Sequence, residues 1–357
     1  MATLDYLPRL VVLYKSILQH QHIPLFILAA DIDPQGVAGL TRQLYEVLPD
    51  SASNNLKIIT PFDIYGEEAT QMRFYYDAFE FATACKAGIH TWMQRNSTID
   101  RWLFIDSDIL CFGSLDPIFD ALDGHDILLT PHLNKPGQTL LEDMQFLSAG
   151  AFNGGVLGVR RSHTSQRFTD WYLKILSCYC LNDPALPWQE RFFQSSVIFV
   201  DQRWLDLVPA YFPDVAIAPN RGFNLGHWNV GQDRLEFRHG LLYIDKDKIT
   251  LLHLSGWLED QPGRLSRHSS LDWSNDPEWT KVHNLYRDAL APLKDLFNMP
   301  YPFNTYSDGT KIPKTHRRAY LRHLLAGGTR LDNPFKMRSE FERALAPRPV
   351  VSGYRWS

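Results

Sequence analysis

Apolar and polar positions follow one another along the chain in blocks that predict strands and helices in turn. Residues 9–20 (RLVVLYKSILQH) carry apolar side chains at helical spacing, and 25–31 (LFILAAD) form a short apolar run typical of a buried strand. A second such strand covers 56–60, a long helical pattern covers 72–93, and 101–106 (RWLFID) form a further strand. This alternation predicts an α/β fold with a parallel sheet and helices packed on its faces. In such folds ligands bind beyond the carboxyl ends of the strands.

Composition narrows the class of protein. The 357 residues are 45% hydrophobic, which is enough to bury a sizeable core, and the formal net charge of -4 gives no global basic field for nucleic acid. Four cysteines are too few for a disulfide framework, so we interpret them as core or incidental thiols. No leader pattern and no run of about 18 apolar residues is present. We therefore expect a cytoplasmic protein without a transmembrane segment, with peripheral contact at the inner membrane face as the alternative.

The carboxy-terminal part differs from the rest of the chain. We predict one main domain over 1–300, a basic helical extension packed on it over 301–345, and a tail over 346–357. Within the extension, KTHRRAYLRHLL (314–325) is typical of a short amphipathic helix. A solvated surface helix is favoured over a site for a polyanionic acceptor or a membrane headgroup, because a basic cluster alone is a weak motif.

Candidate chemistry begins at FIDSDIL (104–110), where Asp106 and Asp108 follow the predicted strand. Spacing by two in extended chain aims both carboxylates to one side. Two hard oxygen ligands suit Mg²⁺ or Mn²⁺, which take further ligands from substrate phosphates. The alternative is a loop with two solvated aspartates.

Four later segments add polar groups. GAFNGGVLGVRRS (150–162) has paired glycines, which allow close backbone approach, beside the amide of Asn153, although a tight turn would also explain them. Asp201 and Gln202 end an apolar run, and GFNLGHWN (222–229) is rich in polar and aromatic side chains; both segments are also compatible with ordinary loop polarity. In ITLLHLSGW (249–257), His253 follows an apolar strand, and a structural histidine is the alternative to a ligand.

The order of these segments resembles bacterial glycosyltransferases of the GT-A fold, close to family 8. The matching segments are ATLDYL (2–7), DSD (106–108), FNGGV (152–156), DQRWLDLVP (201–209), FNLGHWN (223–229), HLSGW (253–257), LSRH (265–268) and YSDGTKIP (306–313), and together they span nearly the whole chain. The resemblance implies a GT-A glycosyltransferase domain over 1–300, an α/β fold with a mixed, mostly parallel sheet flanked by helices. It also implies transfer of a sugar from a nucleotide-sugar donor to an acceptor, with retention of the donor's anomeric configuration.

The resemblance also implies roles for individual residues. Asp106, Asp108 and His253 would hold a divalent ion, Mn²⁺ or Mg²⁺, on the donor diphosphate. Asp201, Gln202 and Asn153 would be catalytic, around the transferred sugar. The implied donor-binding residues are Ala2, Thr3, Tyr6, Lys86, Asp106, Ser107, Asn153, Gly154 and Gly256.

Two departures from the family pattern lead to further expectations. Met1 directly precedes Ala2, where the family has several apolar residues, so we expect weaker nucleotide binding. The family's phosphate-binding lysine after the histidine–glycine segment is replaced by Trp257, Leu258 and Glu259. We expect Arg264, Ser266 or Arg267 to take its place.

Two other classes of protein are weighed against the transferase. A sugar-nucleotide nucleotidyltransferase would normally show a glycine-rich basic loop after the first strand, and none is visible. A catalytically inactive relative that binds a glycan is the other alternative.

Overall fold

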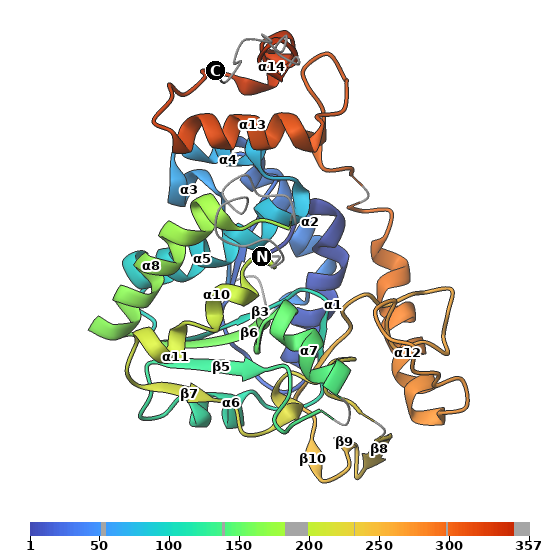
Figure 1. Ribbon diagram of the computed structural model, residues 1–357. Helices are drawn as coiled ribbons and strands as arrows, with labels where there is room; N and C mark the ends of the chain where they lie inside the picture. Colours follow the sequence, from blue (N-terminus) through green and yellow to red (C-terminus); the bar gives the residue numbers. More distant parts are fainter. Residues whose placement is uncertain (51–54, 138–139, 183–198, 232, 298, 346–357) are drawn as a thin grey trace, which may run out of the picture.

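The apolar runs of the sequence form the strands of a mixed α/β fold (Figure 1). The computed structural model describes residues 1–50, 55–137, 140–182, 199–231, 233–297 and 299–345, so the predicted tail lies outside the described residues. Strand β1 (Leu25–Leu28) pairs in parallel with β2 (Leu56–Ile59). A four-stranded sheet has the order β3 (Arg101–Ile105), β6 (Phe152–Arg160), β5 (Ile127–Pro131) and β7 (Val215–Ile217).

The remaining ladders are antiparallel. Strand β4 (Ile109–Cys111) pairs with β11 (Leu251–His253), and β8 (Leu235–Arg238), β9 (Leu241–Ile244) and β10 (Asp247–Lys248) form a small sheet. Strand β6 also runs antiparallel to both of its neighbours, whereas β7 is parallel to β5. The predicted α/β class is confirmed, but the described sheets are not mostly parallel. A strand buried on both faces is a continuous apolar run in either direction, so the pattern does not report strand direction.

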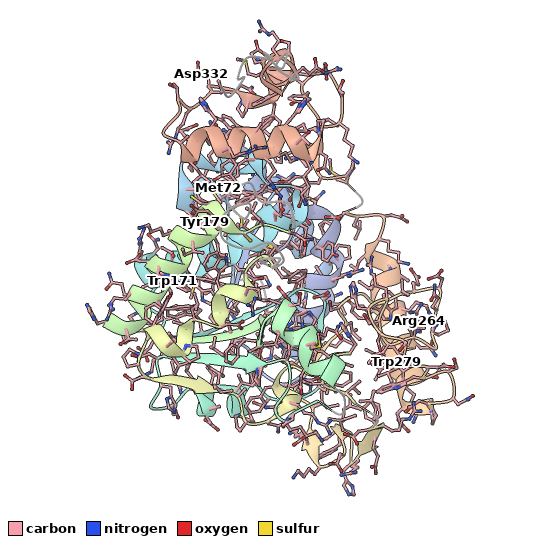
Figure 2. The ribbon with its side chains drawn as sticks, in the orientation of Figure 1. Met72, Trp171, Tyr179, Arg264, Trp279 and Asp332 are labelled. Carbon is pink, nitrogen blue, oxygen red and sulfur yellow. The ribbon has the colours of Figure 1, made fainter. Side chains whose placement is uncertain are left out.

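Helices cover the sheets on both sides. The α-helices are α1 (Leu7–Leu18), α2 (Val37–Val47), α3 (Phe62–Tyr65), α4 (Glu68–Tyr75), α5 (Ala78–Asn96), α6 (Asp116–Ala121), α7 (Leu140–Ala149), α8 (His163–Tyr179), α10 (Gln202–Leu205), α11 (Val208–Tyr211), α12 (Pro277–Leu290), α13 (Lys314–Leu325) and α14 (Arg338–Leu345). One core packs α5 and α8 against the sheet. A second core joins α1 to α12, where Trp279 is fully buried (Figure 2).

The long helix predicted over 72–93 is in fact two helices, α4 and α5. The chain leaves helical geometry at Tyr76 and Asp77. Asp77 then starts α5 with a capping box: its Oδ1 accepts from the Glu80 backbone N–H (2.9 Å), and Glu80 Oε2 accepts from the Asp77 backbone N–H (3.2 Å). The apolar periodicity continues across residues 76 and 77, so it does not indicate that one helix ends and another begins there.

The predicted helix over 314–325 is confirmed as α13, but its basic residues are not all solvated. Figure 1 shows α13 lying across α4. Arg317 and Arg318 are buried, and Arg317 Nη1 donates to the carbonyls of Phe74 and Tyr76, both at 2.6 Å. These are carbonyls at the end of α4 that a helix cannot satisfy by itself. The arginines thus bind the extension to the domain, and the division into 1–300 and 301–345 stays a prediction.

Two predictions based on composition can be compared with the structure. All four cysteines are free thiols, and Cys85, Cys111 and Cys180 are buried. Among the described helices, none combines the length and the apolar character needed to cross a bilayer.

Candidate active site

One loop and one strand end bring three potential metal ligands together. Asp106 and Asp108 lie in the short connection between β3 and β4, and His253 is the last residue of β11. The antiparallel register of β4 and β11 pairs His253 with Ile109, which places the imidazole beside Asp108. One ligand atom from each of the three side chains lies within 4.8 Å of the other two, and this is the one such group among the described residues.

The imidazole of His253 is held in one orientation by Asn224. His253 Nδ1 lies 3.1 Å from Asn224 Oδ1, while its Nε2 lies 3.2 Å from Asp108 Oδ1. Asn224 is itself fixed, because its Nδ2 donates to Thr130 Oγ1 (3.0 Å) and Asn153 Oδ1 (2.9 Å). With its amide nitrogen used there, Asn224 presents its oxygen to His253, so Nδ1 carries a proton and donates to Asn224, and Nε2 is turned toward Asp108. Outer partners of this kind orient metal-binding histidines.

Asp108 carries a negative charge over most of the pH range. Burial alone would raise its pKa, but the charge and hydrogen bond of His253 outweigh burial and lower the pKa to about 2. The Asp108 carboxylate is therefore deprotonated and able to bind a cation at any pH above about 4.

Lys86 links this group to the predicted catalytic aspartate. Its Nζ lies 3.1 Å from Asp106 Oδ2, 3.4 Å from Asp201 Oδ2 and 3.1 Å from the Gly154 carbonyl. Burial by itself would lower the pKa of Lys86, but the two carboxylates raise it, so the ammonium stays charged. Burial raises the pKa of Asp201, and Lys86 opposes that rise. Tyr172 supplies a further hydroxyl donor, 3.4 Å from Asp201 Oδ2.

Asn153 and Gln202 meet on the same side of β6. Asn153 Nδ2 donates to Gln202 Oε1 (2.9 Å), and Gly154 N–H lies 3.4 Å from the same oxygen. Gln202 Nε2 donates to the Ala149 carbonyl (3.3 Å), so both ends of the amide are occupied. The structure thus brings together the three residues predicted as catalytic. Asn153 and Gln202 are hydrogen-bonded to each other, and the Asp201 side chain lies against Gly154, the residue after Asn153.

The paired glycines lie inside strand β6, so the tight turn offered as their alternative explanation is wrong. They let other side chains approach the strand closely. A Cβ on Gly154 would lie 2.1 Å from Asp201 Oδ2, and a Cβ on Gly155 would lie 2.4 Å from His253 Cε1. Neither distance is compatible with a side chain, so both positions require glycine.

The other residues predicted to bind the donor come from the amino-terminal segment, the β3–β4 connection and the turn after β11. Ala2 forms a parallel bridge with Ala29 beside β1, and Thr3 is buried at the start of a short 3-10 helix, η1 (Leu4–Tyr6). Tyr6 is 39% exposed, and Ser107 is buried between the two aspartates. Gly256 has φ +70, which favours glycine, in the turn that follows His253.

The segment predicted to replace the family's lysine packs on that turn. Ser266 Oγ donates to the Ser255 carbonyl (2.6 Å), and Arg267 N–H donates to the Gly256 carbonyl (2.8 Å). Trp257 instead is buried in the core, and Glu259 pairs with Lys294 at the surface. A phosphate role for Arg264 (Figure 2), Ser266 or Arg267 stays a prediction.

Sequence analysis singled out 222–229 but gave no site role to Asn224, His227 or Trp228, which the structure places near His253. Trp228 meets the His253 ring edge-on, with centroids 5.0 Å apart, and His227 lies 5.7 Å from His268. Burial lowers the pKa of His227 to about 3, so it is neutral. All three come from 223–229, a segment whose match to the family pattern was the available signal.

Comparison with known sequences gives distant relatives. No family model matches the chain. It is 22% identical over 292 residues to the uncharacterised protein YfnF of Bacillus subtilis, covering 79% of this chain and 88% of that protein. It is also 22% identical over 165 residues to the uncharacterised protein YfnD of the same bacterium, covering 46% of this chain and 49% of that protein.

Several solved structures are also distantly similar to the chain. The chain is similar to the galactosyltransferase LgtC in complex with donor and acceptor sugar analogues, with 16% identity, 79% of this chain and 94% of that chain covered, and a TM-score of 0.46. It is similar to the Streptococcus pneumoniae glycosyltransferase GlyE at 15% identity, with 85% of this chain and 66% of that chain covered and a TM-score of 0.42. It is similar to mouse xyloside xylosyltransferase 1 at 12% identity, with 62% of this chain and 81% of that chain covered and a TM-score of 0.37. These three solved structures are glycosyltransferases. Each is a distant likeness, at 16% identity or less and with a TM-score below 0.5, and it assigns no substrate to this chain.

Proposed function

We propose that this chain is a divalent-metal-dependent, retaining glycosyltransferase that uses a nucleotide sugar as its donor. The observation that carries the proposal is the group formed by Asp106, Asp108 and His253, with the buried Lys86–Asp201 pair beside it. A cation group next to a buried carboxylate suits a reaction in which a diphosphate leaves a sugar carbon.

The residues of the group fit a divalent ion. Asp106 and Asp108 offer carboxylate oxygens, His253 offers the lone pair of Nε2, and Asn224 holds the ring in place. Two oxygen donors and one imidazole suit Mn²⁺ better than Mg²⁺, which prefers oxygen alone. When bound, such an ion would stabilise the negative charge that develops on the departing nucleoside diphosphate.

The chain's own side chains would organise the sugar. Asp201 is buried and would present negative charge to a sugar ring that becomes positive as the diphosphate leaves, and the positive charge of Lys86 favours the ionised form of that carboxylate. Asn153 and Gln202 would bind sugar hydroxyls, for which amides supply both donors and acceptors. Lys86 is fully engaged with Asp106, Asp201 and Gly154, so we assign it to positioning these carboxylates rather than to direct contact with the donor.

A donor screen tests the function. We expect one or more members of a panel of nucleotide sugars to release nucleoside diphosphate when the protein and Mn²⁺ are present, and the release to stop in excess chelator. A nucleotidyltransferase would instead form or consume pyrophosphate. An inactive relative would bind nucleoside diphosphate in calorimetry without turnover. Full activity in excess chelator would contradict the metal assignment.

Retention of configuration is the expected stereochemical result. We expect an α-linked product from an α-linked donor. Inversion would require a base positioned to deprotonate the attacking acceptor hydroxyl. Asp201 is the obvious carboxylate for that role, but it is already bound by Lys86 and Tyr172. The anomeric coupling constant of freshly formed product, measured by proton NMR, decides the matter. A β-linked product would identify Asp201 as general base and leave the metal group unchanged.

A further inference from the structure

A buried histidine, His132, is hydrogen-bonded to the amide of Asn153. It follows strand β5 directly, and its backbone N–H donates to the Ala151 carbonyl (2.8 Å), which extends the ladder between β5 and β6. The pairing of these strands shifts register between Leu129 and Thr130, and beyond the shift Thr130 lies opposite Asn153. Both residues are therefore held in place by the sheet.

A backbone carbonyl fixes the position of the proton on His132. Nδ1 of the ring lies 2.7 Å from the Gly150 carbonyl, which can only accept, so Nδ1 carries the proton. Burial lowers the pKa of His132 to about 4, so the ring is neutral at pH 7. Nε2 of a neutral ring protonated at Nδ1 is an acceptor, and it lies 3.3 Å from Asn153 Nδ2.

The Asn153 amide is held by four protein groups. Its Oδ1 accepts from Gly155 N–H and from Asn224 Nδ2, both at 2.9 Å. Its Nδ2 donates one hydrogen to Gln202 Oε1 (2.9 Å) and the other to His132 Nε2. Because a backbone N–H can only donate, Gly155 fixes which end of the amide is the oxygen. Both acceptor positions and both donor hydrogens of the amide are then occupied.

The chain of hydrogen bonds continues from Asn153 to His253. Asn224 Nδ2 donates to Asn153 Oδ1, and Asn224 Oδ1 accepts from His253 Nδ1 (3.1 Å). The other ring nitrogen of His253 is turned toward Asp108 (3.2 Å). Both asparagines are buried, so bulk water does not readily replace a partner that is lost. His132 is therefore connected to His253 through two buried amides.

Ring contacts hold His132 from two further directions. Its imidazole stacks on Phe146, with centroids 5.0 Å apart and planes at 21°, and it meets Trp228 edge-on at 5.6 Å. A phenylalanine ring is also flat and aromatic, so His132→Phe would keep these ring contacts and remove both hydrogen bonds. The hydrogen-bonding role of His132 can thus be separated from its packing.

We propose that His132 is a positioning residue for the divalent ion and acts through the two amides to hold His253 in its metal-binding orientation. The inference rests on the proposed function, in which His253 is one of the ligands of the ion. Without the His132 acceptor, one hydrogen of the buried Asn153 amide would have no partner, which is unfavourable. The amide would turn toward another acceptor, and Asn224 and His253 would lose their fixed orientation.

Binding of Mn²⁺ to the full chain, followed by the electron paramagnetic resonance signal of the free ion, tests this role without turnover. Asn224→Ala removes the direct partner of His253 and should weaken binding on the order of 10- to 100-fold, the usual effect of losing such a partner. His132→Phe should weaken it roughly 3- to 10-fold, less because two amides lie between His132 and His253. His132→Gln keeps an oxygen acceptor and should bind Mn²⁺ more tightly than His132→Phe.

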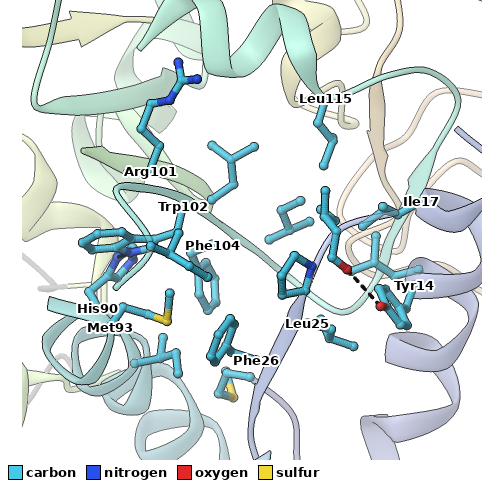
Figure 3. A pocket seen from close by; sticks show the side chains of 18 of the residues that line it. Tyr14, Ile17, Leu25, Phe26, His90, Met93, Arg101, Trp102, Phe104 and Leu115 are labelled. Atoms are coloured by element: carbon cyan, nitrogen blue, oxygen red, sulfur yellow. Dashed lines mark hydrogen bonds between the residues drawn. The ribbon is translucent and has the colours of Figure 1, made fainter. Parts of the chain in front are cut away.

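His90→Phe is the matched control. His90 is also buried, burial lowers its pKa to about 3, and its Nδ1 accepts from Trp102 Nε1 (3.0 Å). Figure 3 shows His90 and Trp102 together in the wall of an apolar pocket. The two phenylalanine variants should lose stability to a similar extent in thermal unfolding, whereas only His132→Phe should bind Mn²⁺ more weakly. Equal weakening of Mn²⁺ binding in both would overturn the positioning role.

Other outcomes separate this role from the proposed function. Unchanged Mn²⁺ binding in His132→Phe, beside weakened binding in Asn224→Ala, would overturn the positioning role and leave the proposed function intact. Absence of Mn²⁺ binding by the unaltered chain would overturn both. If His132→Phe does not fold, nitrogen NMR of the imidazole rings in the unaltered chain decides the question. An unprotonated Nε2 on His132 is expected there, and a protonated Nε2 would overturn the proposal.

Discussion

Replacing Asp108 with asparagine is expected to abolish metal-dependent donor turnover while the protein stays folded. The substitution keeps the size of the side chain but removes the charge that sits 3.2 Å from His253 Nε2. A metal ion contributes several kcal/mol to stabilising a leaving group, so kcat/KM should fall on the order of 10³-fold. The measurement is release of nucleoside diphosphate over a range of Mn²⁺ concentrations.

Asp120→Asn is the matched control, because Asp120 is exposed on α6, is not part of the metal group, and its substitution removes the same charge. It should retain full activity. Circular dichroism on both variants checks the fold. Unchanged turnover in Asp108→Asn, at the same Mn²⁺ requirement, would show that the ion is held elsewhere.

Lys86→Met is expected to destabilise the protein more than any other single change at the site. It would leave Asp106 and Asp201, at 3.1 and 3.4 Å from the lost ammonium, without their shared counter-charge. Removing one partner of a buried ion pair costs about 3–5 kcal/mol, so the melting temperature should fall on the order of 10 °C. Thermal unfolding followed by circular dichroism measures this.

Charge rescue distinguishes this cause from a packing defect. In Lys86→Met combined with Asp201→Asn, the uncompensated carboxylate is gone, so part of the lost stability should return. Lys174→Met, at an exposed position on α8, is the control for loss of a lysine and should melt close to the unaltered protein. A double variant as unstable as the sum of the two single ones would contradict the ion-pair assignment.

The sequence by itself determined those features that depend on neighbours in the chain. The strand 101–106 and the strand-end position of His253 could be predicted because period and apolarity are local properties. The α/β class followed from the same alternation. The capping box at Asp77 and Glu80 was also local and was available as a signal, although the periodicity across it was mistaken for one helix.

Only the tertiary structure decided features that depend on partners distant in the chain. The basic segment 314–325 was expected to be solvated, yet Arg317 binds the Tyr76 carbonyl across 241 positions of sequence. The orientation of His253 depends on Asn224, which belongs to another loop. Antiparallel pairing of β6 likewise joins segments whose apolar runs carry no mark of direction. Local patterns report which face of an element is buried, but the partner that buries it is chosen by packing of the whole chain, which a single sequence does not encode in any one segment.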